Sequence, residues 1–237
     1  MSHFLTINDL ASQASVHLAL SGVYRSRREL QPGTIPEDVP LALSHASKAL
    51  DWFYSAGDRT GEARALTDLS NHYLALSQLQ TARDYCSTAL RLNIDIAHMT
   101  GQVDALDTLG RIHAGLGDYE QAIAYFLNAL ATCSQAGIPV RPPHILESLG
   151  DAYLASGDTT AARATWQELI EYSRRQQRSE HPWQRQSRVL SKLEGLGLDG
   201  LRSGPPAVPP QHDQPQPPPE QPQPEPPPAR WSRAPAS

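Results

Sequence analysis

The feature that most constrains the fold of this chain is a pattern that occurs three times at an offset of 40 residues. It occupies five positions, whose three copies are Leu66, Leu106 and Leu146; Leu69, Leu109 and Leu149; Tyr73, His113 and Tyr153; Ala82, Ala122 and Ala162; and Cys86, Phe126 and Trp166. A fixed period of this size predicts stacked supersecondary units, because one unit alone is too small to bury its own apolar face. The sequence therefore predicts a solenoid, an architecture that usually serves as a binding surface.

Composition and charge narrow the fold class further. Alanine is plentiful, aromatic residues make up 6% of the chain, and valine and isoleucine are sparse. Small side chains suit closely packed helix pairs, whereas a sheet is usually rich in β-branched residues. We therefore expect an all-α protein. The formal net charge of −5 is modest and gives no general attraction to nucleic acid, so direct nucleic-acid binding is not expected.

The repeated positions also indicate a particular kind of helical repeat. The best copies read Leu109-Gly110-x-x-His113, Gly117-Asp118-Tyr119 and Ala122-x-x-x-Phe126, then Leu149-Gly150-x-x-Tyr153, Gly157-Asp158 and Ala162-x-x-x-Trp166. They resemble the tetratricopeptide repeat (TPR), and a weaker copy begins at Leu69. The resemblance implies a right-handed solenoid of helix-turn-helix repeats. The period of 40 exceeds the usual value of about 34, and we expect the extra residues to lengthen the second helix of each unit.

The chain divides into four predicted segments. Residues 1–56 form a degenerate first helix pair, and residues 57–178 form three TPR repeats. Residues 179–200 contain a helix that caps the open end of the solenoid. Residues 201–237 are dominated by proline, glutamine and glutamate, and such a segment cannot bury enough apolar surface to fold. We expect it to be a disordered tail with a bias toward polyproline II.

The TPR resemblance also implies a candidate binding surface. In TPRs the first helix of each pair lines a concave groove, and positions two, five and nine of that helix point into it. Aligned through the repeated leucines, these positions are Arg64, Thr67 and Asn71; Asp104, Asp107 and Arg111; and His144, Glu147 and Asp151. The groove has mixed charge and is acidic toward its C-terminal half, which favours a basic protein or peptide partner. The alternative is that these residues form a solvated face with local ion pairs only.

A second charged region allows two interpretations. Residues 174–192 carry six basic residues and only one acidic residue. They could contact phosphate or an acidic partner. We favour a structural interpretation, in which Arg174 and Arg175 complement a helix dipole and the other basic residues lie on the outer face of the capping helix.

The sequence offers little support for catalysis. It contains no glycine-rich phosphate loop before a helix, no G-x-S-x-G motif, and no His or Cys set at metal-ligand spacing with a third ligand nearby. The groove carboxylates leave general acid–base chemistry only formally open. We therefore expect a non-enzymatic protein without catalytic residues, a bound metal or a cofactor. The two cysteines, Cys86 and Cys133, are expected to be small buried hydrophobes.

The location follows from what the sequence lacks. No apolar stretch approaches the roughly 20 residues that span a bilayer. The first residues lack the basic region of a secretory signal. We therefore expect no membrane association and a cytoplasmic location.

Two junctions extend the resemblance. Residues 56–66 read AGDRTGEARAL, and residues 146–158 read LESLGDAYLASGD. They resemble the C-terminal TPR region of actinobacterial SARP-type transcriptional regulators and related signalling ATPases. The chain shows neither a winged-helix segment nor a phosphate loop, so the resemblance implies the interaction module alone. We expect a protein- or peptide-binding scaffold in a cytoplasmic regulatory pathway. The alternative is a ligand-responsive module of a transcriptional regulator that acts through a separate partner.

Overall fold

A computed structural model describes residues 12–23, 38–137, 142–175 and 182–195 of the 237-residue chain. All of them lie in Met1–Leu196, the first of the two units into which the chain divides. These residues form helices joined by short connections, and the described ranges contain no strand. The all-α prediction is therefore confirmed. The predicted proline-rich tail, residues 201–237, lies outside the described residues.

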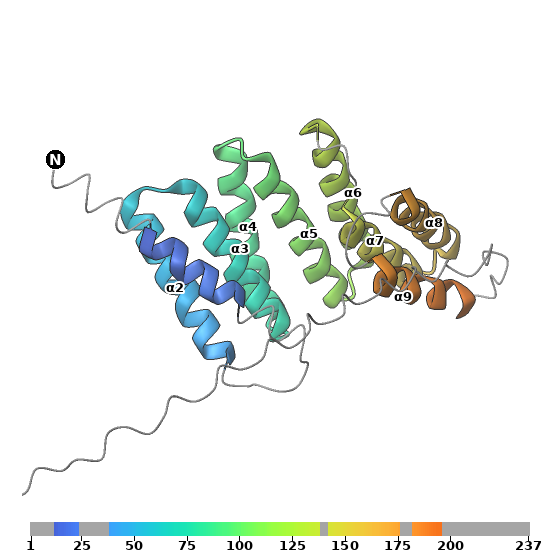
Figure 1. The fold of residues 1–237 in the computed structure, drawn as a ribbon, viewed down its shortest axis with the longest axis horizontal. Coiled ribbons are helices and arrows are strands. Elements are labelled where there is room, and N and C mark those ends of the chain that lie inside the picture. Colours follow the sequence, from blue (N-terminus) through green and yellow to red (C-terminus); the bar gives the residue numbers. More distant parts are fainter. Residues whose placement is uncertain (1–11, 24–37, 138–141, 176–181, 196–237) are drawn as a thin grey trace, which may run out of the picture. The chain divides into compact units, whose positions relative to one another are not determined.

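The helices follow one another in pairs along the chain (Figure 1). After a helix over residues 12–23 come α2 (Asp38–Ala56), α3 (Arg59–Ala75), α4 (Leu79–Asp95), α5 (Met99–Gly115), α6 (Tyr119–Gln135), α7 (Pro143–Ser156), α8 (Thr159–Arg175) and α9 (Pro182–Gly195). Each helix from α2 to α8 packs against the next. The first helices of successive pairs, α3, α5 and α7, also contact one another in that order. This arrangement is a helical repeat solenoid like that of TPR proteins.

The repeated sequence positions form the core of this stack. Both leucine positions are buried in all three copies, with exposed fractions of 9% or less. The alanine position is fully buried in each copy, and so is the position held by Cys86, Phe126 and Trp166. Residues that the 40-residue offset relates therefore occupy equivalent environments, as the period predicts.

The backbone repeats at half the sequence period. A residue with positive φ ends a helix every 20 residues, and these residues are Gly57, Ser77, Ala97, Gly117, Gly137 and Gly157. The residue after most of them donates its amide to a carbonyl five positions back, as Asp118 does to His113 at 3.0 Å. This is the Schellman closure, which satisfies carbonyls at a helix end.

The half-period corrects one sequence expectation. The helices α3, α4, α5 and α6 are all 17 residues long, and three-residue connections separate them. The extra residues of the long repeat are therefore shared by both helices of a unit. The prediction that the second helix alone is lengthened is wrong, because a residue with positive φ follows each helix from α2 to α7 and divides the period equally.

Aspartates begin three of the helices. The carboxylate of Asp58 accepts a hydrogen bond from the Gly61 amide at 2.9 Å, and Asp118 and Asp158 accept equivalent bonds in later copies. Each bond satisfies one amide that has no partner within the helix. The Gly-Asp pairs of the repeat pattern therefore mark helix boundaries, and Gly157 adopts the left-handed conformation just before Asp158.

One of the closures carries backbone strain that substitution can relieve. Ala97 has a φ of 53°, a conformation that costs a side-chain-bearing residue about 1 kcal/mol or more. Ala97→Gly should therefore raise the free energy of unfolding by about 1 kcal/mol. Ala124→Gly is the control, because this exposed position in the middle of α6 should lose about 1 kcal/mol instead. Urea titrations in which both changes destabilise would contradict the assignment.

Candidate functional site

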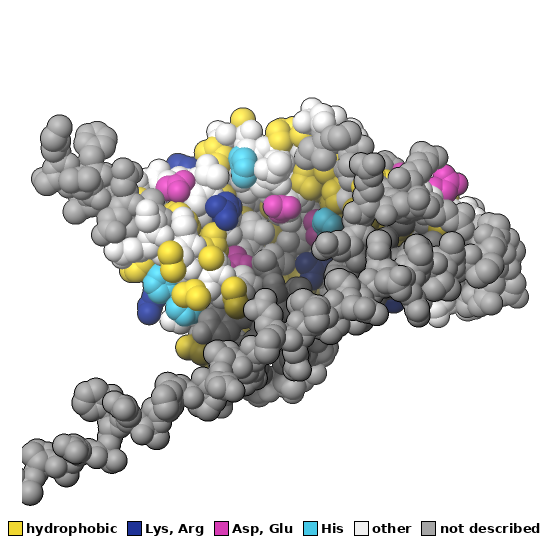
Figure 2. Space-filling view, viewed as in Figure 1, with side chains coloured by type: hydrophobic (Ala, Val, Ile, Leu, Met, Phe, Trp, Pro, Cys, Tyr) yellow, Lys and Arg dark blue, Asp and Glu magenta, His cyan; other side chains and the backbone are white. Residues whose placement is uncertain are grey.

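The nine residues predicted from the TPR resemblance lie on α3, α5 and α7, and their surface is called the first-helix face below. Five of them are exposed, namely Arg64, Asp104, Arg111, His144 and Asp151. Thr67, Asn71 and Glu147 are partly exposed, and Asp107 is buried. In Figure 2 the charged and histidine side chains of the described residues are interspersed with hydrophobic ones and do not form a patch of one sign.

Polar contacts join successive helices across the first-helix face. Arg111 on α5 donates to the Asn71 side-chain oxygen on α3 at 3.4 Å. His144 Nε2 on α7 lies 3.9 Å from Asp107 Oδ2 on α5. Thr67 does not take part, because its hydroxyl donates to the Ala63 carbonyl of its own helix at 3.0 Å. The structure therefore brings four of the nine residues into pairs between neighbouring repeats.

Asp107 is the least solvated of the predicted site residues. It is 7% exposed, and its Oδ1 atom is buried without a hydrogen-bond partner. Burial raises the pKa of this carboxyl, and the nearby Asp104 adds to the effect, while His144 and Arg111 act in the opposite direction. A buried carboxylate oxygen without a donor is costly. Asp107 is therefore a destabilising element at the centre of the first-helix face.

The raised pKa of Asp107 predicts a pH dependence. A carboxyl whose pKa is higher in the folded state stabilises the fold below its ordinary value of 3.8, and that stability is lost as the pH rises through the folded-state pKa. Asp107→Asn removes this titration. The variant should therefore gain more stability relative to the native chain at pH 7 than at pH 3.5. Denaturant titrations at the two pH values test this, and an equal or larger gain at pH 3.5 would contradict it.

The acidic residues of α7 are paired with the C-terminal helix. Lys192 on α9 donates to both carboxylate oxygens of Asp151, at 2.6 and 2.7 Å. Arg188 lies 3.7 Å from Glu147 through one guanidinium nitrogen. The interpretation that places these basic residues on the outer face of the cap is therefore wrong for Arg188 and Lys192. Their side chains reach α7 from α9, which also packs against α8.

These pairs change the charge that the first-helix face presents. The sequence alone suggests an excess of acidic groups on α5 and α7. Two of these groups, Glu147 and Asp151, have cationic partners within the chain. The C-terminal part of the face is therefore closer to neutral than the nine predicted residues suggest.

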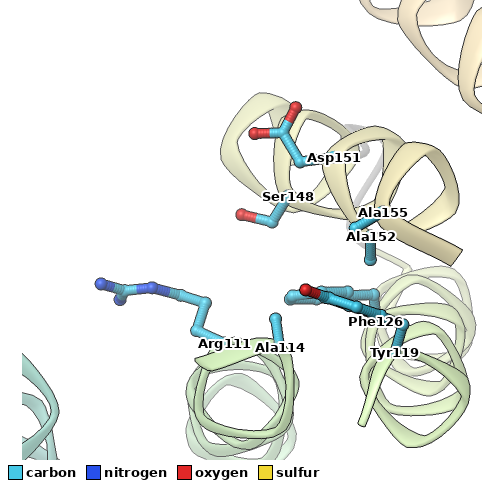
Figure 3. A pocket seen from close by; sticks show the side chains of 8 residues that line it. All are labelled: Arg111, Ala114, Tyr119, Phe126, Ser148, Asp151, Ala152 and Ala155. Atoms are coloured by element: carbon cyan, nitrogen blue, oxygen red, sulfur yellow. The ribbon is translucent and has the colours of Figure 1, made fainter. Parts of the chain in front are cut away.

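A cavity of about 290 Å³ lies between α5, α6 and α7, next to the first-helix face (Figure 3). It is lined by Arg111, Ala114, Tyr119, Phe126, Ser148, Asp151, Ala152 and Ala155. Arg111 and Ser148 reach toward the same open side in Figure 3, while alanine and aromatic side chains form the inner wall. A pocket with an apolar wall and polar groups at its mouth can hold one side chain of a bound peptide.

A buried polar cluster that the sequence does not predict lies between helix 12–23 and α3. Ser21 donates to Asp68 and lies 2.6 Å from His72 Nε2, and Asp68 lies 3.5 Å from the same nitrogen. In a Ser-His-Asp catalytic triad the serine and the aspartate contact different ring nitrogens. Here both approach Nε2, and all three residues are buried. The cluster therefore joins helix 12–23 to α3, and no periodic signal in the sequence marks it.

Other chemistry is limited in the described residues. Burial raises the pKa of the Cys86 thiol to about 12, and Cys133 is also buried and free. Both cysteines therefore pack as the sequence predicts. Within the described ranges, no three His, Cys, Asp or Glu side chains lie together as a metal site would require. None of the helices described is both long and apolar enough to cross a bilayer.

The repeats match a known family. Residues 101–175, which contain α6 to α8 and all of α5 except its first two residues, match the tetratricopeptide repeat model. These residues are therefore similar to tetratricopeptide repeats. The match covers the two copies whose TPR pattern is most complete in the sequence, and it supports the description of the chain as a TPR protein. No curated protein shows a significant match to the sequence.

Several solved structures share this fold. The apo form of RapI is 12% identical, with a TM-score of 0.58, over 78% of this chain and 70% of its own. A Rap protein complexed with Competence and Sporulation Factor is 15% identical, with a TM-score of 0.58, over 83% of this chain and 55% of its own. A Podosopora anserina protein with nearly identical TPR-like repeats is 15% identical, with a TM-score of 0.57, over 78% of this chain and 92% of its own. Identities this low establish the fold alone.

Proposed function

We propose that this chain is a non-catalytic scaffold that binds a protein or peptide on its first-helix face. The observation that carries the proposal is the cavity between α5, α6 and α7, whose lining includes the polar residues Arg111, Ser148 and Asp151. Two of these three residues belong to the nine predicted from the TPR pattern. A peptide that follows successive first helices would place one side chain in this cavity and its polar groups along the interhelical pairs.

The likeness to peptide-bound repeat proteins supports this assignment. One similar structure is a Rap protein in complex with Competence and Sporulation Factor. Repeat solenoids of this type present extended surfaces that suit elongated ligands. The proposal carries over only the kind of ligand, a protein or peptide, and none of the residues of that complex.

The partner is proposed to be basic in the segment that meets α7. Glu147 and Asp151 provide two carboxylates on this helix, and complementary potential favours a cationic segment. Because Arg188 and Lys192 already contact these carboxylates, such a partner must compete with α9.

The cellular role is proposed to be regulatory and cytoplasmic. The alternative is a ligand-responsive module of a SARP-type transcriptional regulator, for which the only support is the sequence of the repeat junctions at residues 56–66 and 146–158. Recovery of a DNA-binding or ATPase protein as the stable partner would favour this alternative.

Blocking the cavity tests the proposed function. Ser148→Trp places a large side chain at the mouth, and Ser87→Trp makes the same change at an exposed position of the second helix α4. The full-length variants are immobilised, and proteins captured from a native lysate are quantified by mass spectrometry. Ser148→Trp should reduce capture of the principal partner about tenfold or more, while Ser87→Trp leaves it unchanged. Equal capture by both variants, with native circular dichroism, would contradict binding at this face.

A further inference from the structure

The helix α9 presents charge and apolar groups in a repeated order. Arg188 and Lys192 are four residues apart, and each is followed by an apolar residue, Val189 and Leu193. Val189 and Leu193 are 0% and 1% exposed. Positions four apart lie on the same side of a helix. One side of α9 is therefore buried while the neighbouring side carries two cations.

The surface beneath α9 matches this order. Glu147 and Asp151 are also four residues apart, on α7, and each faces one of the two cations. Lys192 contacts α8 as well, with its ammonium 5.7 Å from the centre of the Trp166 ring. Two charge pairs with the same spacing on both helices define the register of α9 against α7.

We propose that the surface of α7 and α8 under α9 is a docking site for a basic amphipathic helix of the partner, and that α9 occupies this site within the free chain. The inference rests on the proposed function, because Glu147 and Asp151 belong to the first-helix face. The partner helix carries two cations four residues apart, each followed by an apolar residue. Its cations replace Arg188 and Lys192, and its apolar residues replace Val189 and Leu193.

The pairs that hold α9 are suited to exchange. The side chains of Arg188 and Asp151 are 65% and 47% exposed, whereas those of their partners Glu147 and Lys192 are 14% and 32% exposed, so water reaches at least one member of each charge pair. Exposed pairs contribute little individually. A partner helix with the same pattern of residues would bury about the same apolar area that α9 exposes on leaving. The exchange therefore changes the total buried apolar surface little. Compared with a separate partner helix, α9 has a high effective concentration at the site, because it belongs to the same chain.

A labelled peptide with the sequence of α9, residues 182–195, is the probe. Its binding to full-length protein is measured by fluorescence anisotropy. In the protein, R188Q/K192Q weakens the hold of α9 on its own site. The labelled peptide should therefore bind about ten times more tightly than it does to the native chain. Adding E147Q/D151N to that variant should abolish the gain. Circular dichroism and the melting temperature establish that each variant retains its helices.

A charge exchange provides a test that unfolding cannot imitate. In full-length protein with E147K/D151K, the site should reject the native peptide and bind a peptide that carries R188E/K192E. Unfolded protein would not distinguish the two peptides by charge. Equal binding of both peptides, or equal binding by the native chain and R188Q/K192Q, would overturn the proposal. Dimerisation of R188Q/K192Q without peptide binding would also overturn it, by identifying a second copy of the chain as the occupant.

The outcome is separable from that of the proposed function. If Ser148→Trp reduces partner capture while the peptide experiments fail, the first-helix face binds a partner but not through a helix that replaces α9. If the peptide experiments succeed while Ser148→Trp has no effect, the helix site stands and the cavity is not part of it.

Discussion

Replacing Phe126 with alanine should lower the free energy of unfolding by about 3–5 kcal/mol, as expected for truncation of a fully buried aromatic side chain. Phe126 is fully buried on α6, at the position that Cys86 and Trp166 occupy in the neighbouring repeats. Its ring lies against Gly110 of α5 and lines the inner wall of the cavity beside α7. Truncation would therefore remove contacts within one repeat and at the junction with the next.

Leu127 is the matched control for this prediction. It follows Phe126 on the same helix, is 44% exposed, and should lose less than about 1 kcal/mol on truncation to alanine. Both variants are compared by chemical denaturation. A loss below about 1 kcal/mol for Phe126→Ala would show that the repeated aromatic position is not part of the core.

Gly110→Ala should lower the free energy of unfolding by about 1–3 kcal/mol, although alanine is the better helix former. A β-carbon at position 110 would lie 2.6 Å from Cε1 and 2.7 Å from Cδ1 of Phe126. The ring has no solvent-exposed surface, and moving it away from position 110 would disturb its packing on α6. The clash therefore outweighs the gain in helix propensity.

The two substitutions should couple, because each acts on the same space. In a chain that already carries Phe126→Ala, the ring is absent and the methyl group of Gly110→Ala meets no obstacle. Gly110→Ala should then stabilise the chain by up to about 1 kcal/mol, from helix propensity alone. A double-mutant cycle measures this reversal. Additive effects, with Gly110→Ala equally harmful in both backgrounds, would contradict close packing of position 110 on the ring.

Much of the fold is predictable from the sequence because the repeat places one residue type in one environment each time. The leucine positions, the alanine position and the position held by Cys86, Phe126 and Trp166 are all buried, as the 40-residue period predicts, while the position held by Tyr73, His113 and Tyr153 is partly exposed in all three copies. The equal helix lengths were harder to predict, since Ser77 and Ala97 occupy left-handed positions where glycine is the usual signal. Glycine marks the 20-residue half-period at positions 117, 137 and 157 but not at positions 77 and 97, so the sequence shows the half-period only in part.

The candidate site was predictable in position but not in its electrostatics. The repeat register places the nine residues on α3, α5 and α7, whereas their contacts depend on how these helices pack. Asp107 is buried although its type and position suggest a solvated charge. Glu147 and Asp151 pair with residues 41 positions later in the chain. These partners lie on α9, a helix that is not part of the repeats recognised in the sequence. The Ser21, Asp68 and His72 cluster likewise joins segments about 50 residues apart, a distance at which periodicity carries no signal.

The central claim is that a protein or peptide partner lies on the first-helix face. Site-specific photo-crosslinking tests it most directly, with a photoreactive residue placed at position 148 in one full-length variant and at position 87 in another. Each variant is irradiated with a native lysate, and the crosslinked products are identified by mass spectrometry. The account predicts one principal product from position 148 and none from position 87. A partner crosslinked from position 87 but not from position 148 would contradict it.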